Sequence, residues 1–177
     1  MNKKTPNEAL NRINEFEFKE AKKTPLIIVL DNVRSAQNVG SIFRTADSFL
    51  IEKIILCGIT PTPPSREINK TALGSTETVS WSHQELTKKA ISQLKNEGVI
   101  CIAAEQTENS IDLRSLEVSR SKKYALVLGN EVDGVDQEVI DMCASSAEIP
   151  QFGTKHSLNI SVCAGIMIWD FFQLLKP

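Results

Sequence analysis

The feature that most constrains the fold is a short, unbroken apolar run, Leu26-Ile27-Ile28-Val29-Leu30. Its β-branched content and its lack of polar alternation are typical of a strand buried on both faces, as in a parallel sheet. Four further segments predict strands, over 53–57, 99–104, 124–128 and 147–150. Helical patterns lie between them, so the sequence predicts an α/β domain with a mainly parallel sheet flanked by helices.

Helices are expected at six places: 6–22, 39–50, 67–74, 82–98, 136–143 and from Ser157 to the end of the chain. The first rests on a capping box, Thr5-Pro6-Asn7-Glu8, with an apolar stripe after it that must dock on something. Another capping box, Ser82-His83-Gln84-Glu85, opens the helix that should close at Gly98. Asn38 is expected to cap the helix over 39–50 through its side-chain oxygen.

The composition is that of an ordinary globular protein. With 177 residues and 41% hydrophobic content, the chain is expected to form one domain with a substantial core. Lys and Arg total 20 against 22 Asp and Glu, which gives a formal net charge of −2. Any contact with nucleic acid must therefore come from a local basic patch.

Cysteine usage and the chain's ends predict a soluble cytoplasmic protein. The 4 cysteines are isolated, no CxxC pair occurs and there are only 2 histidines, so neither a disulfide framework nor a metal site is expected. The N-terminal residues are polar and do not form a secretion signal. The most apolar stretch, 158–175, is interrupted by Asn159, Asp170 and Gln173, which argues against a membrane span.

Three polar loops follow predicted strands, at the carboxyl ends where parallel sheets carry binding sites. The loop over 31–45 has a glycine in the first turn of the expected helix, which costs helix stability unless something approaches closely there. In the loop over 128–136, Gly129 would let a ligand lie against the backbone. Neither GxGxxG nor GxxxxGK[ST] occurs anywhere in the chain. Taken singly, an ordinary helix cap and an ordinary acidic turn explain these two loops as well.

The third loop, over 149–159, leads into a C-terminal helix that is apolar on nearly every face. Such a helix either fills a core or is shared between a core and a partner chain. Its N-terminus offers free N–H groups that suit a carboxylate or a phosphate. A plain helix start at Ser157 is the alternative for this loop.

Taken together and in order, the loops resemble the three motifs of the SpoU (TrmH-like) branch of the SPOUT RNA methyltransferases. The first motif is Asn38, Gly40 and Arg44, and the second is Gly129-Asn130-Glu131 with Gly134 after a strand. The third is Ile149-Pro150, then Gly153, then Ser157-Leu158-Asn159-Ile160-Ser161-Val162. The resemblance covers about 26–175, with Gln151 where Met is usual and Cys163-Ala164-Gly165 in place of an Ala-rich run.

The resemblance implies a SPOUT α/β-knot fold, with a deep trefoil knot in the C-terminal part. It also implies S-adenosyl-L-methionine as methyl donor, a homodimer through the C-terminal helix, and methylation of a ribose 2′-hydroxyl in structured RNA. Residues 25–177 would be the methyltransferase domain and 1–24 an N-terminal helical extension. We expect the extra N-terminal RNA-binding domain of some relatives to be absent, and we therefore expect tRNA rather than rRNA as the substrate.

The resemblance also suggests roles for single residues. Arg44 would be the base or the orienting group; since an Arg pKa above about 12 makes a poor base, we expect it to position and polarise the target phosphate and hydroxyl. Asn38 would orient Arg44 or the ribose, Ser157 and Asn159 would shape the site, and Glu131 would organise the loops. The expected cofactor-binding residues are Gly129, Ile149, Leu158, Ala104 and Glu105. The expected RNA contacts are Arg34, Arg44, Arg66, Lys155, Lys70 and the cluster Lys19, Lys22 and Lys23.

Two other readings stay open. A non-catalytic RNA-binding or assembly protein could use the same fold, although the motif residues Arg44, Glu131, Ser157 and Asn159 are all present. A Rossmann-type nucleotide enzyme is disfavoured by the missing glycine fingerprint.

Overall fold

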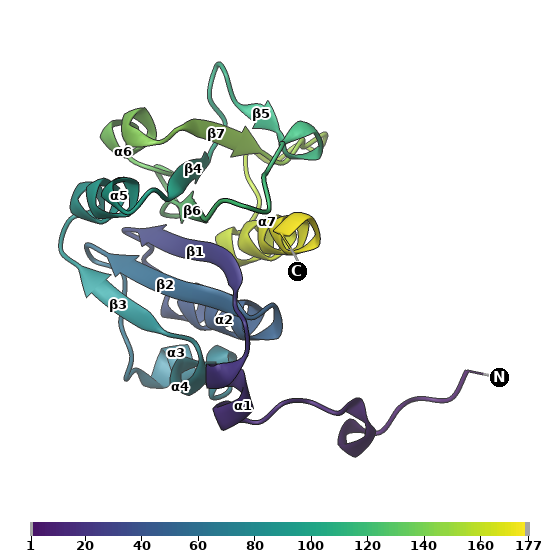
Figure 1. Cartoon of the computed structure of the whole chain (residues 1–177). Helices are drawn as coiled ribbons and strands as arrows, with labels where there is room; N and C mark the ends of the chain where they lie inside the picture. Colours follow the sequence, from purple (N-terminus) through teal and green to yellow (C-terminus); the bar gives the residue numbers. More distant parts are fainter. Residues whose placement is uncertain (1, 176–177) are drawn as a thin grey trace.

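A single parallel sheet forms the centre of the molecule in the computed structural model, which describes residues 2–175 (Figure 1). Its strand order is β3-β2-β1-β6-β4-β7-β5, and every neighbouring pair is parallel. The strands are β1 (Thr24–Asp31), β2 (Ile51–Cys57), β3 (Trp81–Gln84), β4 (Ile100–Ala104), β5 (Ile111–Asp112), β6 (Tyr124–Leu128) and β7 (Ser145–Glu148). The predicted α/β architecture is therefore confirmed, with β3 and β5 as short edge strands that the sequence did not indicate.

Helices cover both faces of this sheet (Figure 1). They are η1 (Asn7–Leu10), α1 (Glu15–Glu20), α2 (Ala36–Ser48), α3 (Arg66–Ala72), α4 (Ser75–Thr78), α5 (Thr87–Asn96), η2 (Leu113–Ser115), α6 (Gln137–Met142) and α7 (Ile160–Leu175). One core packs α2, α3 and α7 against the sheet, and the other packs α5 and α6 against its opposite face.

The central strand β1 contributes to both cores, as its apolar run predicts. Leu26, Ile28 and Leu30 point into the core under α2 and α7, whereas Ile27 and Val29 point into the core under α5. Each such side chain stabilises the fold by roughly 1.5–3 kcal/mol through burial. Strands β1, β6 and β4 lie side by side, so the loops that follow them emerge at one edge of the sheet.

The prediction of one long N-terminal helix is wrong. The segment instead contains the short helices η1 and α1, with Asn11 in a left-handed conformation between them (φ 48°). The capping box that forms is that of Asn14 with Glu17, not that at Thr5. The expected apolar stripe stays largely exposed, with Phe16 74% exposed. A longer helix would therefore not be stabilised by burial of an apolar face.

Two other predicted caps are also wrong. Ser82 to Gln84 belong to β3 and pair with β2, so their backbone groups are already used and α5 begins at Thr87. Gly98 does close that helix in a left-handed conformation (φ 78°). At α2 the capping side chain is Ser35, which accepts a hydrogen bond from the Asn38 N–H over 3.2 Å.

The C-terminal helix α7 begins at Ile160, three residues later than predicted from Ser157. Its inner face is buried through Ala164, Ile168 and Phe171, but Val162 and Ile166 are 50% and 41% exposed. The helix is therefore not buried on all sides within one chain, and an apolar stripe faces outward. None of the helices between residues 2 and 175 is both long and apolar enough to cross a bilayer.

Candidate active site

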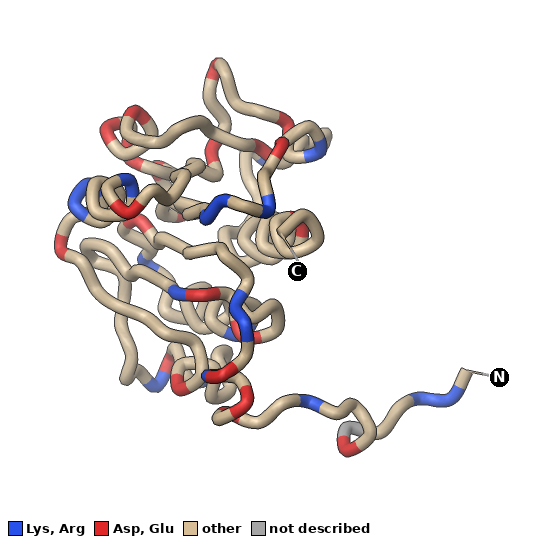
Figure 2. Tube along the Cα trace, in the orientation of Figure 1, with Lys and Arg blue, Asp and Glu red and all other residues tan. Residues whose placement is uncertain are grey.

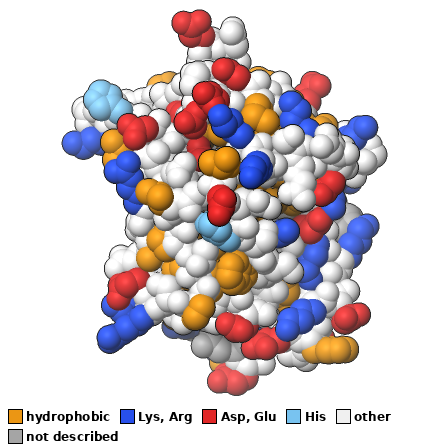
Figure 3. All heavy atoms as spheres, turned by 90° about the vertical axis from the view of Figure 1, so that its left-hand side faces the viewer, with side chains coloured by type: hydrophobic (Ala, Val, Ile, Leu, Met, Phe, Trp, Pro, Cys, Tyr) orange, Lys and Arg blue, Asp and Glu red, His pale blue; other side chains and the backbone are white. Residues whose placement is uncertain are grey.

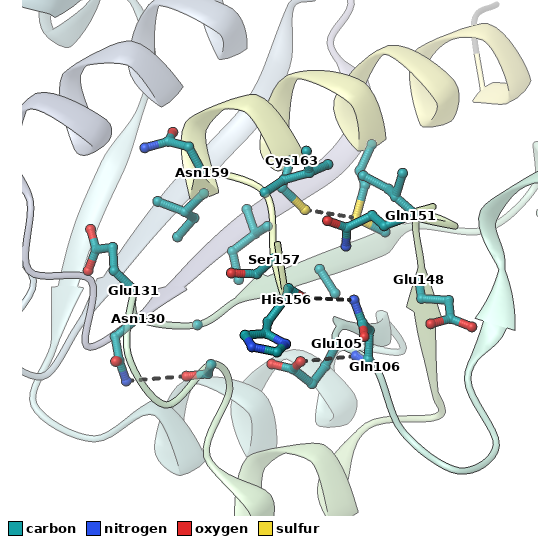
Figure 4. A pocket seen from close by; sticks show the side chains of 18 of the residues that line it. Glu105, Gln106, Asn130, Glu131, Glu148, Gln151, His156, Ser157, Asn159 and Cys163 are labelled. Carbon is teal, nitrogen blue, oxygen red and sulfur yellow. Dashed lines mark hydrogen bonds between the residues drawn. The ribbon is translucent and has the colours of Figure 1, made fainter. Parts of the chain in front are cut away.

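The second and third of the loops described in the sequence border one cavity of about 480 Å³ (Figure 4), and the first loop contacts them without lining the cavity. This volume lies within the range of about 300–1,000 Å³ that small-molecule sites occupy. The cavity lies at the carboxyl ends of β4, β6 and β7 and is closed on one side by the start of α7. It is lined by Ala104, Glu105, Gln106, Leu128, Gly129, Asn130, Glu131, Val132, Asp133, Gly134, Ala147, Glu148, Ile149, Gln151, His156, Ser157, Leu158, Asn159, Ile160, Cys163 and Met167.

The loop after β6 folds back on itself into a tight turn. Asn130 and Gly134 exchange two backbone hydrogen bonds of 3.0 and 3.1 Å, and Gly134 adopts a left-handed conformation (φ 71°). A Cβ atom at Gly129 would overlap the backbone of Gly134 and Val135. Glycine at 129 is therefore required for this turn to form, and it leaves bare backbone on the cavity wall.

Glu131 ties this turn to the first loop. Its carboxylate accepts hydrogen bonds from the backbone N–H groups of Arg34 and Ser35 over 3.1 and 3.2 Å, and from the Asn38 amide over 2.9 Å. Burial acts to raise the pKa of Glu131, but the hydrogen bonds that it accepts outweigh burial and hold the pKa below its ordinary value. Glu131 is thus an ionised side chain that connects the first loop to the turn after β6.

Asn159 connects the same network to the third loop. Its Nδ2 donates to Oδ1 of Asn38 over 3.3 Å, and its Oδ1 accepts from the backbone and hydroxyl of Ser161 over 2.9 and 2.7 Å. Asn159 thereby caps α7 while contacting Asn38. The structure thus joins Asn38, Glu131 and Asn159 into one network, which we call the loop-tying network. Ser157 lines the cavity beside it.

Arg44 stands apart from the loop-tying network. It lies on α2, its side chain is exposed, and it does not line the cavity. Within residues 2–175 its guanidinium has neither a hydrogen-bond partner nor an ion-pair partner. Helix α2 packs against α7, so Arg44 belongs to the α2/α7 side of the molecule.

All five residues expected to bind the cofactor line the cavity: Ala104, Glu105, Gly129, Ile149 and Leu158. Glu105 also has a structural task, because Oε2 accepts from the Val135 N–H and Oε1 from the Gln106 N–H, both over 3.0 Å. It therefore holds the end of β4 against the turn after β6.

The cavity wall is acidic. Four carboxylates line it, those of Glu105, Glu131, Asp133 and Glu148, and no Lys or Arg does. Cys163 contributes a neutral thiol, because burial raises its pKa to about 11, and its Sγ lies 3.9 Å from Sδ of Met167. A wall of this kind favours a ligand with positive charge and disfavours a polyphosphate.

Sequence reasoning missed Asp31, which lies at the end of β1 and is only 1% exposed. Its carboxylate accepts hydrogen bonds from the Thr87 hydroxyl, the Asn32 amide and the Asp136 N–H, the last over 3.0 Å. Asp31 thereby fixes the starts of α5 and α6 beneath the turn after β6. The sequence signal that could have identified Asp31 is its position directly after the buried apolar run over 26–30.

The expected RNA contacts are spread over the surface. Arg34 forms an ion pair with Asp133 over 3.8 Å, and Lys70 pairs with Glu67 over 2.7 Å. Arg66 and Lys155 are exposed and have no ion-pair partner in the described part of the chain. Basic and acidic residues are both spread over the trace, although the charged residues of α6 are all acidic (Figure 2). On the side where α5 and β3 lie, no single sign of charge dominates (Figure 3).

Comparison with known proteins adds sequence and structural relatives. The chain is 31% identical over 155 residues to a Staphylococcus aureus protein named for the TrmH family of tRNA/rRNA methyltransferases, covering 88% of this chain and 61% of that protein. It is 31% identical over 144 residues to the 23S rRNA (guanosine-2'-O-)-methyltransferase RlmB of Neisseria meningitidis, covering 81% and 56%. The chain thus spans less than two thirds of the length of these relatives.

Solved structures agree with the sequence relatives. The AdoMet-bound rRNA methyltransferase from Sinorhizobium meliloti matches with a TM-score of 0.81 and 30% identity, covering 90% of this chain and 61% of that one. The TrmH/SpoU tRNA modifying enzyme of A. aeolicus matches with a TM-score of 0.78 and 26% identity, covering 90% and 79%. The family model of the SpoU rRNA methylases matches residues 25–169, which is the whole sheet except Thr24 and the first ten of the 16 residues of α7. The chain belongs to the SpoU rRNA methylase family.

Proposed function

We propose that this protein is an RNA methyltransferase that uses S-adenosyl-L-methionine to methylate a ribose 2′-hydroxyl in structured RNA. The observation that supports this most is the cavity itself. Residues of the second and third family motifs line it, and the loop-tying network connects Asn38 of the first motif to Glu131 and Asn159 on its wall. tRNA is our first choice over rRNA, because the A. aeolicus tRNA enzyme is matched over more of its length than the S. meliloti rRNA enzyme.

The cavity fits the proposed cofactor in size and charge. S-adenosyl-L-methionine carries a sulfonium and an ammonium against one carboxylate, so its net positive charge suits a wall with four acids and no Lys or Arg. Bare backbone at Gly129 and apolar contacts from Ile149 and Leu158 suit a flat, neutral adenine. When bound, the sulfonium supplies an activated methyl group, which leaves the protein with positioning and proton removal.

The chain's own residues would divide that work. Asn38 and Asn159 would orient the ribose, Ser157 would shape the site, and Glu131 would keep the loops in register through its three hydrogen bonds. Arg44 would hold the target phosphate and polarise the hydroxyl. Because an Arg side chain stays protonated at neutral pH, we assign it this electrostatic role and not that of a simple base.

We further propose a homodimer through α7. The outward stripe of Val162 and Ile166 on this helix is apolar and uncovered within one chain. A second copy packed on α7 would bury the stripe. Because α2 packs against α7, the second copy would also lie near α2, the helix that carries Arg44. Residues 25–177 would form the methyltransferase domain, with the C-terminal knot of the family, and 1–24 a separate extension.

The direct test is to incubate the protein with methyl-tritiated S-adenosyl-L-methionine and unmodified tRNA or rRNA transcripts. We expect label in one RNA, resistant to alkaline cleavage at one position. Arg44→Ala should lose most of this activity, whereas Arg12→Ala, on the exposed N-terminal segment, should keep it. Cofactor binding without label in any tRNA or rRNA would argue for another RNA. If neither label nor cofactor binding were detected, the proposal would be overturned in favour of a non-catalytic RNA-binding protein.

A further inference from the structure

The loop between β7 and α7 presents one aromatic side chain to solvent. Phe152 is 91% exposed, more than any other large hydrophobic side chain that the structure describes. Resting on the function proposed above, we propose that Phe152 is the stacking platform of a subsite for an unstacked base of the substrate RNA.

A second cavity lies beside this side chain. Its volume is about 400 Å³, and its lining residues are Gln106, Glu148, Pro150, Gln151, Phe152, Lys155 and His156. Four of them, Gln106, Glu148, Gln151 and His156, also line the larger cavity. An occupant of the second cavity therefore lies next to whatever fills the first.

The polar groups around Phe152 match the edge of a nucleobase. Within residues 2–175 the Glu148 carboxylate and the Gln151 amide have no hydrogen-bond partner, so the carboxylate can accept from a ligand and the amide can both donate and accept. A nucleobase combines an apolar face with donors and acceptors on its edge, as such a subsite requires. The Lys155 ammonium is free to contact the adjoining phosphate, whereas Glu148 disfavours a phosphate inside the cavity.

Trp169, another exposed aromatic residue, does not offer such a platform. Trp169 packs on Phe49 and Phe172 of its own chain, with ring centroids 5.4 and 5.9 Å apart. Phe152 has no ring partner among the described residues. Phe152 borders the second cavity, whereas the other exposed aromatic side chains, Phe16, Trp81 and Trp169, do not.

The subsite lies away from the loop-tying network. Figure 4 shows Glu131 and Asn159 at one end of the larger cavity and Gln106, Glu148 and Gln151 at the other. The base on Phe152 therefore belongs to a different nucleotide from the one whose ribose faces the network. Its loss should weaken RNA binding and raise KM for RNA, while kcat stays close to that of the wild type.

The test uses binding and turnover separately. Fluorescence anisotropy would measure the affinity for a labelled single-stranded RNA of mixed sequence and for the same sequence as a duplex. Phe152→Ala should weaken single-strand binding roughly 5- to 150-fold, the range for loss of one base–aromatic stack, and barely change duplex binding. Phe152→Trp should bind like the wild type, and Phe152→Leu should not restore binding. Phe16→Ala, which removes another exposed Phe, is the matched control.

Three results would overturn the inference. If Phe152→Ala bound single-stranded RNA as tightly as the wild type, Phe152 would not be a stacking platform. If Phe152→Leu bound as tightly as the wild type, only apolar contact would matter. A parallel loss of S-adenosyl-L-methionine affinity would assign the second cavity to the cofactor. Because RNA binding is read without turnover, failure of methyl transfer alone would overturn the proposed reaction and leave the stacking subsite standing.

Discussion

The side-chain amide of Asn38 donates a hydrogen bond to Oε1 of Glu131 over 2.9 Å, across a separation of 93 residues in the sequence. This contact joins the first turn of α2 to the turn after β6. Since Glu131 also accepts from the backbone of Arg34 and Ser35, one carboxylate holds the whole first loop. The first and second motifs are therefore connected directly in the folded chain.

A double-mutant cycle should measure that contact. Asn38→Ala and Glu131→Ala should each lower the free energy of unfolding, and their coupling should be no more than about 1 kcal/mol, since Asn38 is half-buried and Glu131 is exposed. Urea unfolding of the wild type, both single variants and the double variant gives the coupling. Strict additivity would mean that the hydrogen bond contributes nothing in solution.

Gly129→Ala should weaken cofactor binding strongly. The added Cβ would overlap the backbone of Gly134 and Val135, which cannot shift without opening the turn, at a cost of about 1–3 kcal/mol. Titration calorimetry with S-adenosyl-L-methionine should show at least a tenfold loss of affinity. Gly153→Ala is the matched control, because a Cβ there meets nothing within 4 Å. Equal affinities of the two variants would contradict the proposed position of the cofactor.

Asp31→Asn should destabilise the fold. The carboxylate accepts three hydrogen bonds, and an amide in its place must turn its NH₂ toward at least one of those donors. Leaving a buried donor without an acceptor costs about 1–3 kcal/mol, which urea unfolding would detect. Asp141→Asn, at an exposed position on α6, should change stability by less than about 0.5 kcal/mol. Similar values for both would show that Asp31 is not important for stability.

The sequence could predict those parts whose physical cause is local. The run at 26–30 is apolar on both faces, and only a strand between two helix layers can bury it. The positions of the polar loops could also be predicted, because the carboxyl ends of parallel strands lie at the same edge of the sheet. The predicted helix caps at Thr5 and Ser82 do not form, because tertiary contacts determine the local structure at both positions. Ser82 pairs with β2, and nothing covers the stripe that includes Phe16. Asp31 was missed because its partners, Thr87 and Asp136, are distant in sequence.

Ile166→Glu should give monomers. Ile166 lies between Val162 and Trp169 on the outward stripe of α7, so a carboxylate there would be buried in the proposed interface without a partner. Sedimentation equilibrium should show the mass of one chain, with an unchanged circular dichroism spectrum. Ile59→Glu, at a 66% exposed loop position, should leave the mass as in the wild type. A wild-type protein that is already monomeric at micromolar concentration would rule out the dimer.

Asp170→Asn should stabilise the protein at neutral pH. Oδ2 of Asp170 is buried and has no hydrogen-bond partner among residues 2–175, and burial raises the pKa of this carboxyl. Because the pKa is higher in the folded state than in the unfolded state, the stability linked to this group is complete below the unfolded-state pKa. It is lost as the pH rises through the folded-state pKa. At pH 7 the wild type therefore carries a poorly solvated charge that the variant lacks.

Thermal unfolding across pH tests this directly. At pH 7 the Tm of Asp170→Asn should exceed that of the wild type, with roughly 3 °C for each 1 kcal/mol gained in a domain of this size. The gain should vanish as the pH falls through the folded-state pKa of Asp170, because the wild-type carboxyl then becomes neutral as well. Glu117→Gln, at an exposed position, serves as the control. A lower Tm of Asp170→Asn at pH 7 would contradict the prediction and would mean that a cation from a second copy of the chain pairs with Asp170.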